Sequence, residues 1–275
     1  MTKVWFITGS SRGLGRATVE AALNSGDSVI GTARNPDTLK DIAETFGTAR
    51  FLPLAVDVSK EEDVVKAIKA GHEKFGRIDV VVNNAGYGDV VAIEDISSAD
   101  FKAHIDTNFM GVVYTTKAVL PILRQQRSGH IFQVSSIGGR FTTPGFGAYQ
   151  SAKWAIGGFS TVLAQEVAPF GIKVTVLEPG GMRTDALGLA VRDLAISEPY
   201  KQTVGASADM FGQMSGNEPS SPEKVARIMV QLAGSEDDAP VRLLVGPDAV
   251  ELGAKIAKEL AASDEKWRSV SLSSA

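Results

Sequence analysis

The chain has 275 residues, and its 28 Lys and Arg against 32 Asp and Glu give a formal charge of −4. Hydrophobic residues at 44% and 28 glycines provide for a sizeable core and exclude an intrinsically disordered chain. The acidic balance argues against nucleic-acid binding, and the absence of cysteine excludes disulfide frameworks, thiolate metal sites and cysteine nucleophiles.

Short β-branched runs alternate with longer amphipathic segments along the chain. Strands are predicted at Val4–Ile7, Ser28–Thr32, Arg50–Leu54, Ile78–Val82, His130–Val134, Ile172–Leu177 and Val241–Val245. Helices are predicted at Leu14–Asn24, Pro36–Phe46, Lys60–Phe75, Ser98–Arg124, Ala148–Ala168 and Pro222–Ala233. This alternation is typical of βαβ crossovers. It predicts an α/β fold, a Rossmann-type doubly wound parallel sheet of about seven strands with helices on both faces.

Two segments depart from the alternation. Residues 185–220 carry Gly, Ser, Pro, Met and Phe without strand periodicity. Residues 246–275 have helix-forming Ala, Lys and Glu and then a Ser-rich polar end. Since no linker divides the chain, we expect one domain over residues 1–245 that includes 185–220 as a substrate lid. A C-terminal helical extension and polar tail would follow over 246–275.

Hydropathy predicts a cytoplasmic protein that makes no membrane contact. The first apolar run, Val4–Ile7, has four residues, which is too short for the apolar region of a signal peptide. No other run approaches the roughly 18 apolar residues of a membrane span. The lack of cysteine also fits a reducing compartment.

The first strand–helix junction is rich in glycine. It reads Thr8-Gly9-Ser10-Ser11-Arg12-Gly13-Leu14-Gly15. Gly9 would allow the turn, Gly13 the close approach of a diphosphate, and Gly15 close packing of helix on strand. The free N–H groups and dipole of a helix N-terminus form an anion site. A plain turn with incidental glycines is the alternative interpretation.

Five further motifs follow in order. They are Asn83-Asn84-Ala85-Gly86 after the fourth strand, Asn108 inside a long helix, Ser136, Tyr149-x-x-x-Lys153 and Pro179-Gly180-x-x-x-Thr184. With the T-G-x-x-x-G-x-G spacing of the glycine loop, this set resembles the short-chain dehydrogenase/reductase family in its single-domain form. The resemblance covers residues 3 to about 245.

Tyr149 and Lys153 are four residues apart on a predicted helix and therefore share one face. An ammonium about 4 Å from a phenol can lower the phenol's pKa from about 10 by roughly three units. The resemblance implies that Tyr149 is the general acid/base, and that Lys153 lowers its pKa and holds the nicotinamide ribose. A surface Tyr–Lys pair is the alternative.

Ser136 follows a strand at the carboxyl edge of the sheet, where its hydroxyl can donate to a substrate carbonyl oxygen. Ser135 is the competing residue, and the family's thirteen-residue offset from the tyrosine favours Ser136. The resemblance implies that Asn108 distorts its helix and seats a water molecule in a proton relay. A purely structural asparagine is the alternative.

The second strand ends in Thr32-Ala33-Arg34, where an acidic residue would mark an NAD-dependent enzyme. Arg34, with Arg12 nearby, suits the 2′-phosphate of NADP. The resemblance also implies that Asp57-Val58 holds the adenine, Asn83 the ribose region, and Thr184 the carboxamide. The expected cofactor-binding residues are Gly9, Ser11, Arg12, Gly13, Leu14, Gly15, Arg34, Asp57, Val58, Asn83, Ala85, Gly86, Tyr149, Lys153, Pro179, Gly180 and Thr184.

Apolar residues on the glycine-punctuated lid favour a hydrophobic ligand. The expected substrate pocket consists of Ser136, Phe141, Phe146, Tyr149, Met182, Leu187, Met210 and Phe211. An ordinary surface helical segment is the alternative. The three histidines, His72, His104 and His130, lack partners at ligand spacing, so no metal site is expected.

These observations predict an NADP(H)-dependent carbonyl reductase or alcohol dehydrogenase acting on a mostly apolar ketone, aldehyde or secondary alcohol. The alternatives are a non-enzymatic NADP-sensing regulator on the same fold and a sugar-nucleotide epimerase-like enzyme. The resemblance implies pairing through the segments Ser98–Arg124 and Ala148–Ala168, often with a further contact at the edge of the last strand. We expect Ala249–Ala262 and Trp267 to fold back over that edge, which favours a homodimer over a tetramer.

Overall fold

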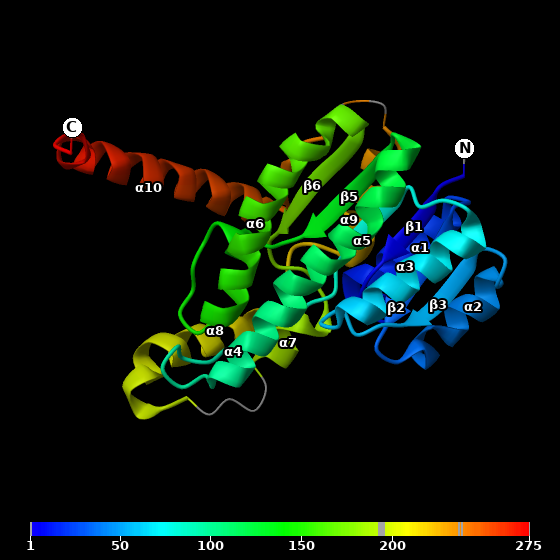
Figure 1. Ribbon diagram of the computed structural model, residues 1–275. Helices are drawn as coiled ribbons and strands as arrows, with labels where there is room; N and C mark the ends of the chain where they lie inside the picture. The colour runs from blue at the N-terminus through cyan, green and yellow to red at the C-terminus, as the bar shows by residue number, and fades with distance from the viewer. Residues whose placement is uncertain (1, 192–195, 236, 238, 275) are drawn as a thin grey trace.

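A parallel sheet forms the centre of the computed structural model, which describes residues 2–191, 196–235, 237 and 239–274 (Figure 1). The seven strands are β1 Val4–Ile7, β2 Ser28–Ala33, β3 Phe51–Ala55, β4 Val80–Asn83, β5 Gly129–Val134, β6 Ile172–Pro179 and β7 Arg242–Val245. Their order is β3-β2-β1-β4-β5-β6-β7, and every pair is parallel. The predicted fold class is confirmed.

Helices cover both faces of the sheet. The α-helices are α1 Gly13–Asn24, α2 Lys40–Phe46, α3 Glu61–Phe75, α4 Ser98–Ile105, α5 Gly111–Gln126, α6 Gly147–Val167, α7 Asp185–Ala190, α8 Ala206–Met214, α9 Pro222–Gly234 and α10 Pro247–Leu272. Short 3-10 turns η1 Pro36–Leu39, η3 Ile137–Gly139, η4 Ala168–Phe170 and η5 Glu198–Tyr200, and π-helical turns η2 Asp106–Met110 and η6 Lys201–Gly205, complete the set. Helices α3, α5 and α6 lie in front of the sheet in Figure 1, with α1 and α9 behind it.

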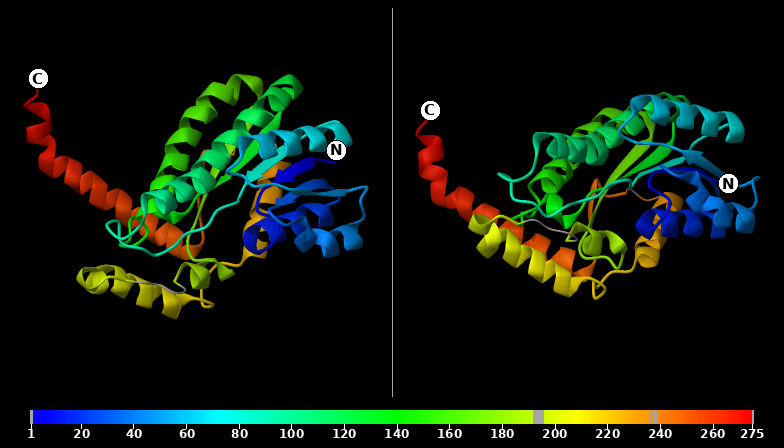
Figure 2. Two further views of the ribbon diagram at one scale, coloured as in Figure 1. Left: turned by 60° about the horizontal axis from the view of Figure 1, so that its bottom comes forward. Right: turned by 90° about the horizontal axis from the view of Figure 1, so that it is seen from below.

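Successive side chains of β1 enter two different cores, as a strand covered on both faces requires. Trp5 and Ile7 pack with residues of α1 and α9, whereas Val4 and Phe6 pack with residues of α3, α5 and α6. Figure 2 shows the same two helical layers from below. All four side chains of β1 are buried, which explains why its sequence is apolar throughout.

The structure differs from the prediction in three segments. The predicted helix Pro36–Phe46 consists of the turn η1 and the helix α2, and the long helix from Ser98 contains the π-helical turn η2. The extension after β7 is one 26-residue helix, α10. Only its first turns pack on the body, with Ala249 and Gly253 buried, and the rest projects away (Figures 1 and 2). The expected folding back therefore holds only for those first turns.

None of the helices in the described ranges is both long and apolar enough to cross a lipid bilayer.

Gly15 allows α1 to lie directly against the turn after β1. A Cβ at Gly15 would overlap the carbonyl oxygen of Gly9, and it would also meet the Asn84 side-chain amide at 2.5 Å. By contrast, a Cβ at Gly158, which is exposed in α6, would meet nothing within 4 Å. A side chain at Gly15 would therefore be crowded, whereas one at Gly158 would have free space.

We expect Gly15→Ala to lower the free energy of unfolding by about 1–3 kcal/mol, because the overlap must be relieved by backbone movement. Gly158→Ala, the matched control, should raise it by up to about 1 kcal/mol because alanine favours helix. Thermal or urea unfolding of both variants measures the difference. Equal effects of the two substitutions would contradict this account of α1 packing.

Candidate active site

The loops that carry the motifs meet at the carboxyl ends of the strands. In Figure 1 these ends point toward α4, α7 and α8. The strand order reverses between β1 and β4, which is the switch point where doubly wound sheets bind ligands. The loops after β1, β4, β5 and β6 therefore border one region.

The N-terminus of α1 is open to an anion. Its N-cap, Arg12, makes no side-chain capping bond, and the first turn has no acidic residue. Ser10 fixes the preceding loop, since its hydroxyl donates to the carbonyl of Ile7 and its backbone N–H donates to Thr32. The unsatisfied N–H groups and the helix dipole both favour a phosphate here. The predicted diphosphate subsite fits this geometry.

Asn84 joins the glycine loop to the loop after β4. Its side-chain amide donates to the carbonyls of Thr8 (3.0 Å) and Gly9 (3.1 Å). The hydroxyl of Thr8 accepts from the backbone N–H groups of Asn84 and Ala85. Four hydrogen bonds thus hold the two loops together.

Asn83, the residue expected to reach the cofactor ribose, points its side chain elsewhere. Its amide donates to Gln133 at 2.8 Å within the sheet, and the residue is 3% exposed. A contact from Asn83 to a bound nucleotide would therefore have to come from its backbone. The sequence did not distinguish the roles of the two asparagines, because they are adjacent and chemically identical.

The adenosine side of the region contains the predicted residues at the ends of β2 and β3. Ala33 is buried at the end of β2, and Arg34 is exposed beyond it. Asp57 accepts hydrogen bonds from the Ser59 hydroxyl and N–H, which hold the pKa of the Asp57 carboxyl below its ordinary value. Arg34 lies near enough to Asp57 to add a smaller lowering. The two residues therefore flank the same space.

Ser136, Tyr149 and Lys153 come together between η3 and α6. Ser136 caps η3 by accepting the N–H of Gly138 at 3.0 Å, which leaves its own O–H free to donate. The Lys153 ammonium donates to the carbonyl of Val134 at 2.8 Å and lies 5.4 Å from the centre of the Tyr149 ring. Ser135, the competing residue, donates its O–H to the Lys153 carbonyl.

The pKa values of this pair differ from the sequence expectation. Burial raises the pKa of Tyr149, and the nearby Ser136 hydroxyl opposes that rise. Burial also lowers the pKa of Lys153 to about 8. Burial thus moves the Tyr149 pKa in the direction opposite to the lowering that the Tyr–Lys spacing predicts.

Asn108 lies fully buried in the π-helical turn η2, so the expected helix distortion is present. Its amide donates to the carbonyls of Tyr87 and His104, and its oxygen accepts the N–H of Tyr87. A Cβ at Gly86 would meet the Asn108 oxygen at 2.5 Å, and one at Gly88 would meet the Tyr149 ring at 3.0 Å. The segment 86–88 therefore links Asn108 to Tyr149.

The segment after β6 contacts two acidic residues that the sequence analysis missed, one through its carboxylate and one through its backbone carbonyl. Asp248, in the first turn of α10, accepts the N–H of Gly181 at 2.7 Å. Glu218 is 1% exposed beside Gly181, and the carbonyl of Glu218 accepts from the Arg183 side chain. No local sequence signal marks either residue, since the contacts span 35 positions for Glu218 and 67 for Asp248.

A cavity of about 590 Å³ opens between the glycine loop and α7. It is lined by Arg12, Arg183, Thr184, Asp185, Gly188, Leu189, Ser215 and Gly216. Thr184 caps α7, and its methyl group lies where a Cβ on Gly13 would meet it at 3.3 Å. The predicted residues Arg12, Gly13 and Thr184 are thus brought together.

The predicted apolar pocket is only partly assembled. Phe146 packs edge-on against Tyr149 (6.0 Å between ring centres) and Phe211 (5.1 Å). Met182 instead packs against the core beside α1 and α9. Met210 and Phe141 are exposed to 46% and 37%, and Leu187 is partly buried.

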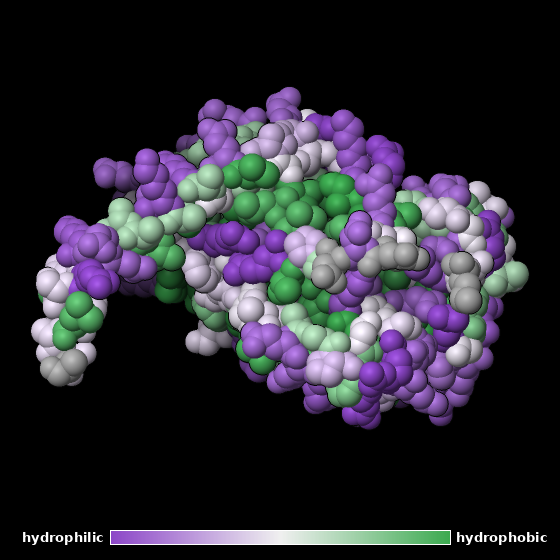
Figure 3. Space-filling view, turned by 90° about the horizontal axis from the view of Figure 1, so that it is seen from above, coloured by the Kyte–Doolittle hydropathy of each residue, from purple (hydrophilic) through white to green (hydrophobic). Residues whose placement is uncertain are grey.

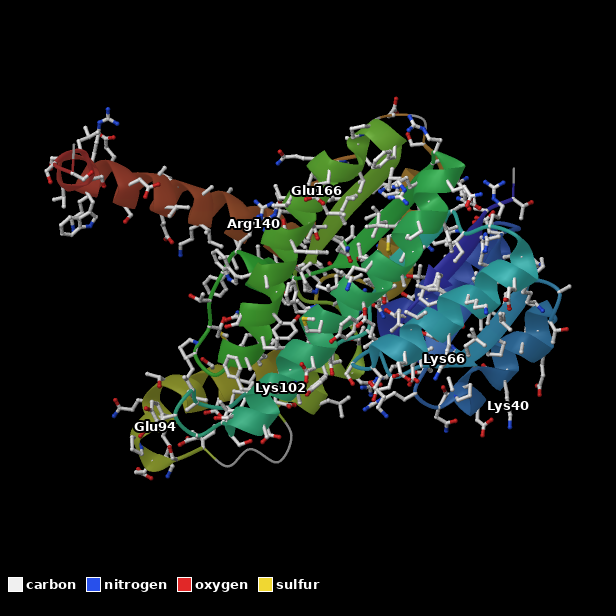
Figure 4. All side chains as sticks on the ribbon, in the orientation of Figure 1. Lys40, Lys66, Glu94, Lys102, Arg140 and Glu166 are labelled. Carbon is white, nitrogen blue, oxygen red and sulfur yellow. The ribbon has the colours of Figure 1, made fainter. Side chains whose placement is uncertain are left out.

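The segment 185–220, which the sequence predicts to be a lid, packs on the segment between β4 and α4. Val90, Ala92 and Phe146 form one apolar cluster with the lid residues Ala190, Val204 and Ala208. Ser197 donates to Asp95, and Tyr200 donates to Glu94, which Figure 4 labels beside the lid. Arg192, a cationic lid residue, lies outside the described residues.

A buried carboxylate connects β6, β7 and η3. Glu178 is 0% exposed and pairs with Arg242 of β7 and with Arg140, which follows η3 (Arg140 Nη2 to Oε2, 2.6 Å). Figure 4 labels Arg140 where α10 leaves the body. This cluster fixes the loop after Ser136 relative to the strand that precedes Gly180.

Two of the histidines are buried. His104 contacts Asp89 at 3.1 Å and stacks on Tyr87, and His130 contacts the Thr175 hydroxyl at 2.9 Å. Within the described ranges, no three His, Cys, Asp or Glu side chains are grouped in a way that could hold a metal ion.

Comparison with known proteins gives a consistent picture. Residues 3–194 match the short chain dehydrogenase family. Oxidoreductase BOA17 of Botryotinia fuckeliana is 62% identical over the full length of both chains. A short-chain dehydrogenase from Streptomyces avermitilis superposes over both whole chains with a TM-score of 0.90 and 33% identity.

Two further solved structures contain nicotinamide nucleotides. A 3-ketoacyl-(acyl-carrier-protein) reductase from Brucella melitensis complexed with NADH has 27% identity and a TM-score of 0.76, over 89% of this chain and 96% of that chain. An alcohol dehydrogenase from Thermococcus sibiricus complexed with 5-hydroxy-NADP has 28% identity and a TM-score of 0.73, over 90% and 97%.

The burial of the Lys153 ammonium predicts how the free energy of unfolding depends on pH. Its pKa is about 8 in the folded chain against 10.5 for an ordinary lysine, so the unfolded chain binds more protons between those values. Stability should therefore rise with pH across this window. Relative to Lys153→Met, the natural chain should gain about 3 kcal/mol from pH 7.5 to 10.5.

Urea unfolding at several pH values measures this difference. Lys66→Met, at an exposed position on α3 that Figure 4 labels, is the matched control and should show no such slope. A natural-minus-Lys153→Met difference that stays flat with pH would contradict the burial argument.

Proposed function

This chain belongs to the short-chain dehydrogenase family and is therefore an oxidoreductase. We propose that it is an NADP(H)-dependent carbonyl reductase or alcohol dehydrogenase. Its substrate would be a mostly apolar ketone, aldehyde or secondary alcohol. The observation that carries the proposal is the convergence of a free Ser136 hydroxyl, a partly buried Tyr149 and a buried Lys153 beside an apolar cluster.

The three side chains have complementary roles in this proposal. Tyr149 would give its phenolic proton to the substrate oxygen during reduction, and remove it during oxidation. Ser136 would donate its O–H to the same oxygen while its own oxygen accepts the N–H of Gly138. An ammonium on Lys153 would favour the phenolate of Tyr149 once charge develops there.

Asn108 takes a different role from the one that the resemblance implies. Both ends of its amide are used by backbone groups of Tyr87 and His104. We therefore propose that the side chain positions the segment 86–88 against Tyr149 and Lys153. A proton relay to water would not use the Asn108 amide.

NADP(H), when bound, supplies or accepts the hydride. The open N-terminus of α1 would hold its diphosphate, and Asp57 with Val58 its adenine. Thr184 and the backbone from Pro179, which Asp248 fixes, would hold the carboxamide. Tyr149 and Lys153 would meet the nicotinamide ribose.

Charge at the end of β2 supports NADP over NAD. Ala33 stands where an acidic residue would bond both ribose hydroxyls, and Arg34 is exposed next to it. Arg34 also lies near Asp57 on the adenine side. A guanidinium at this place suits a 2′-phosphate. Arg12, which lines the cavity with Arg183, would contribute a second positive charge from the glycine loop.

The apolar cluster supports the substrate class. Phe146 lies against both Tyr149 and Phe211, and the lid closes this cluster with Val204 and Ala208. A bulky apolar group would replace water at these rings. A small charged keto acid would lose its hydration in this cluster without an apolar surface to bury in exchange.

We expect NADPH consumption to be fastest, by kcat/KM, with bulky or aromatic ketones and aldehydes, and slowest with small charged keto acids. Tyr149→Phe should lower kcat by about 10²–10⁴-fold while cofactor binding survives, because only the proton donor is lost. Tyr200→Phe is the matched control, since the Tyr200 hydroxyl, on the lid, donates to Glu94 of the segment between β4 and α4. Steady-state rates across a carbonyl panel measure both.

Three outcomes would count against the proposal. Small charged keto acids giving the highest kcat/KM would contradict the substrate class. Tyr149→Phe retaining most of the activity would remove its acid–base role. Tight NADPH binding without turnover of any carbonyl compound would favour the alternative function, a non-enzymatic NADP-sensing regulator.

NADPH should bind at least tenfold more tightly than NADH, a difference of about 1.4 kcal/mol. Arg34→Asp should reverse the order, because the new carboxylate repels the phosphate and accepts from the ribose hydroxyls. Fluorescence titration of both nucleotides measures this. Lys66→Asp, which makes the same charge change on α3, should leave the preference intact. Equal affinities in the natural chain would refute the assignment.

A further inference from the structure

A buried histidine next to the site takes no part in the proposed reaction. Within α4, all of which the structure describes, His104 is the one buried residue, with 2% of its surface exposed. It lies four residues before Asn108, so both side chains project from the same side of the helical run through η2. Lys102, which Figure 4 labels, is exposed on the other side of α4. The helix therefore directs this histidine toward the segment that Asn108 holds.

That segment has no regular structure, so the contacts of individual groups hold it in place. We call residues 86–90 the strap. At its start, the Asn108 side chain donates to the carbonyl of Tyr87 (2.9 Å) and accepts the Tyr87 N–H (3.1 Å). At its end, the N–H of Val90 donates to the carbonyl of Ala190 in α7 (3.0 Å). The strap thus runs from Asn108 to the predicted lid.

The middle of the strap passes the ring of Tyr149. A Cβ at Gly88 would meet that ring at 3.0 Å, so the Gly88 backbone lies directly against it. Glycine has no side chain with which to hold this position. The next residue, Asp89, has a half-exposed side chain whose carboxylate contacts His104 Nε2 at 3.1 Å. The place of the strap at the ring therefore depends on this neighbouring contact.

His104 holds the strap on both sides of Gly88. Its ring stacks on the ring of Tyr87, with 4.3 Å between the ring centres and 35° between the planes. An imidazole that carries its proton on Nε2 donates to the Asp89 carboxylate, and such a charge-assisted hydrogen bond is stronger than a neutral one. One buried ring thus contacts the residue before Gly88 and the residue after it.

We propose that His104 is a positioning residue for Tyr149. Together with Asp89 it holds the strap against the tyrosine ring, and so aligns the phenolic O–H with the substrate oxygen. This inference rests on the proposed function, in which Tyr149 is the proton donor. A misplacement of about 1 Å at a reacting group can cost about 100-fold in rate, so a loosened strap would slow the reaction. Because the strap also binds α7, the same anchor joins the lid to the ring.

His130 shows what a histidine with a purely structural role looks like in this chain. It is 4% exposed, contacts the Thr175 hydroxyl at 2.9 Å and stacks on Phe132 with 3.9 Å between the ring centres. It lies near the start of β5, whereas the site lies at the carboxyl ends of the strands. His130→Phe is therefore a control matched to His104→Phe in burial, in the lost polar contact and in the retained stacking.

Hydrogen exchange of the Val90 amide, followed by NMR without nucleotide, tests the anchor independently of activity. His104→Phe keeps a ring against Tyr87 but loses the donor, and should raise the exchange rate about tenfold. His104→Gln offers an N–H to Asp89 and should restore most of the protection. His130→Phe should leave the rate unchanged, and thermal unfolding checks that every variant is folded. Unchanged exchange in His104→Phe would overturn the proposal.

Turnover of NADPH with the aromatic ketone of highest kcat/KM tests the link to Tyr149. With kcat counted per NADPH-binding site, so that unfolded chain is excluded, His104→Phe should lower kcat by about 10–100-fold. The NADPH Kd should not change, and His104→Gln should recover most of the rate. Asp89→Ala should match His104→Phe, and the double variant should be no slower than either, because both substitutions break one contact.

Three kinetic results would overturn the positioning role. They are a normal kcat in His104→Phe, additive losses in the double variant, and equal losses in His104→Phe and His130→Phe. If the natural chain turns over no carbonyl compound, the proposed function is wrong and the positioning role falls with it, even where the exchange result holds. If Tyr149→Phe abolishes turnover but His104→Phe does not slow it, the proposed function stands and this inference alone fails.

Discussion

The hydrogen bonds between Asn84 and the turn after β1 hold together the two loops on which the site depends. β1 and β4 are neighbours in the sheet, but the chain leaves them in opposite directions, so nothing in the ladder itself keeps their loops in contact. The Asn84 amide and the Thr8 hydroxyl provide that contact. The same closeness excludes a side chain at Gly15 and brings α1 to the centre of the site.

The site residues are positioned by polar groups that bind backbone, rather than by one another. Asn108 fixes the segment 86–88, Asp248 fixes Gly181, and Ser135 binds the carbonyl of Lys153. Glu178 adds a buried charge between two arginines, an arrangement that is costly to break because it would leave the carboxylate unpaired. In the proposed reaction, the hydroxyls of Ser136 and Tyr149 would therefore be surrounded by polar groups that hold the backbone and take no part in the chemistry.

Much of this could be predicted from local sequence. All seven strands were recognised because a buried parallel strand needs a continuous apolar run, and such runs are short and easily delimited. The choice of Ser136 over Ser135 stays a prediction; Ser135 donates its O–H to the Lys153 carbonyl. These predictions depend on spacing within one element or between adjacent elements, which a sequence displays directly.

What could not be predicted depends on contacts between distant segments. Met182 is apolar and close to the motif, so the sequence placed it in the pocket. The pairing of its backbone with Ser220 instead turns its side chain toward the core beside α9. The pKa of Tyr149 depends on burial, which spacing alone does not give. The end of α10 has the pattern of a packed helix but no partner within the described chain, so its pattern was attributed to the sheet edge.

The contact made by the first turn of α10 determines how far the chain could be shortened from its C-terminal end. The Asp248 carboxylate holds the N–H of Gly181, whereas every described residue after Ile256 is exposed, on the part of the chain that stands apart as an arm in Figure 3. A stop codon after Ile256 and one before Asp248 differ by only a few codons, yet the first removes an exposed arm and the second also removes the carboxylate that holds Gly181. The boundary between catalytic body and appendage therefore lies inside a single helix, two turns after its start.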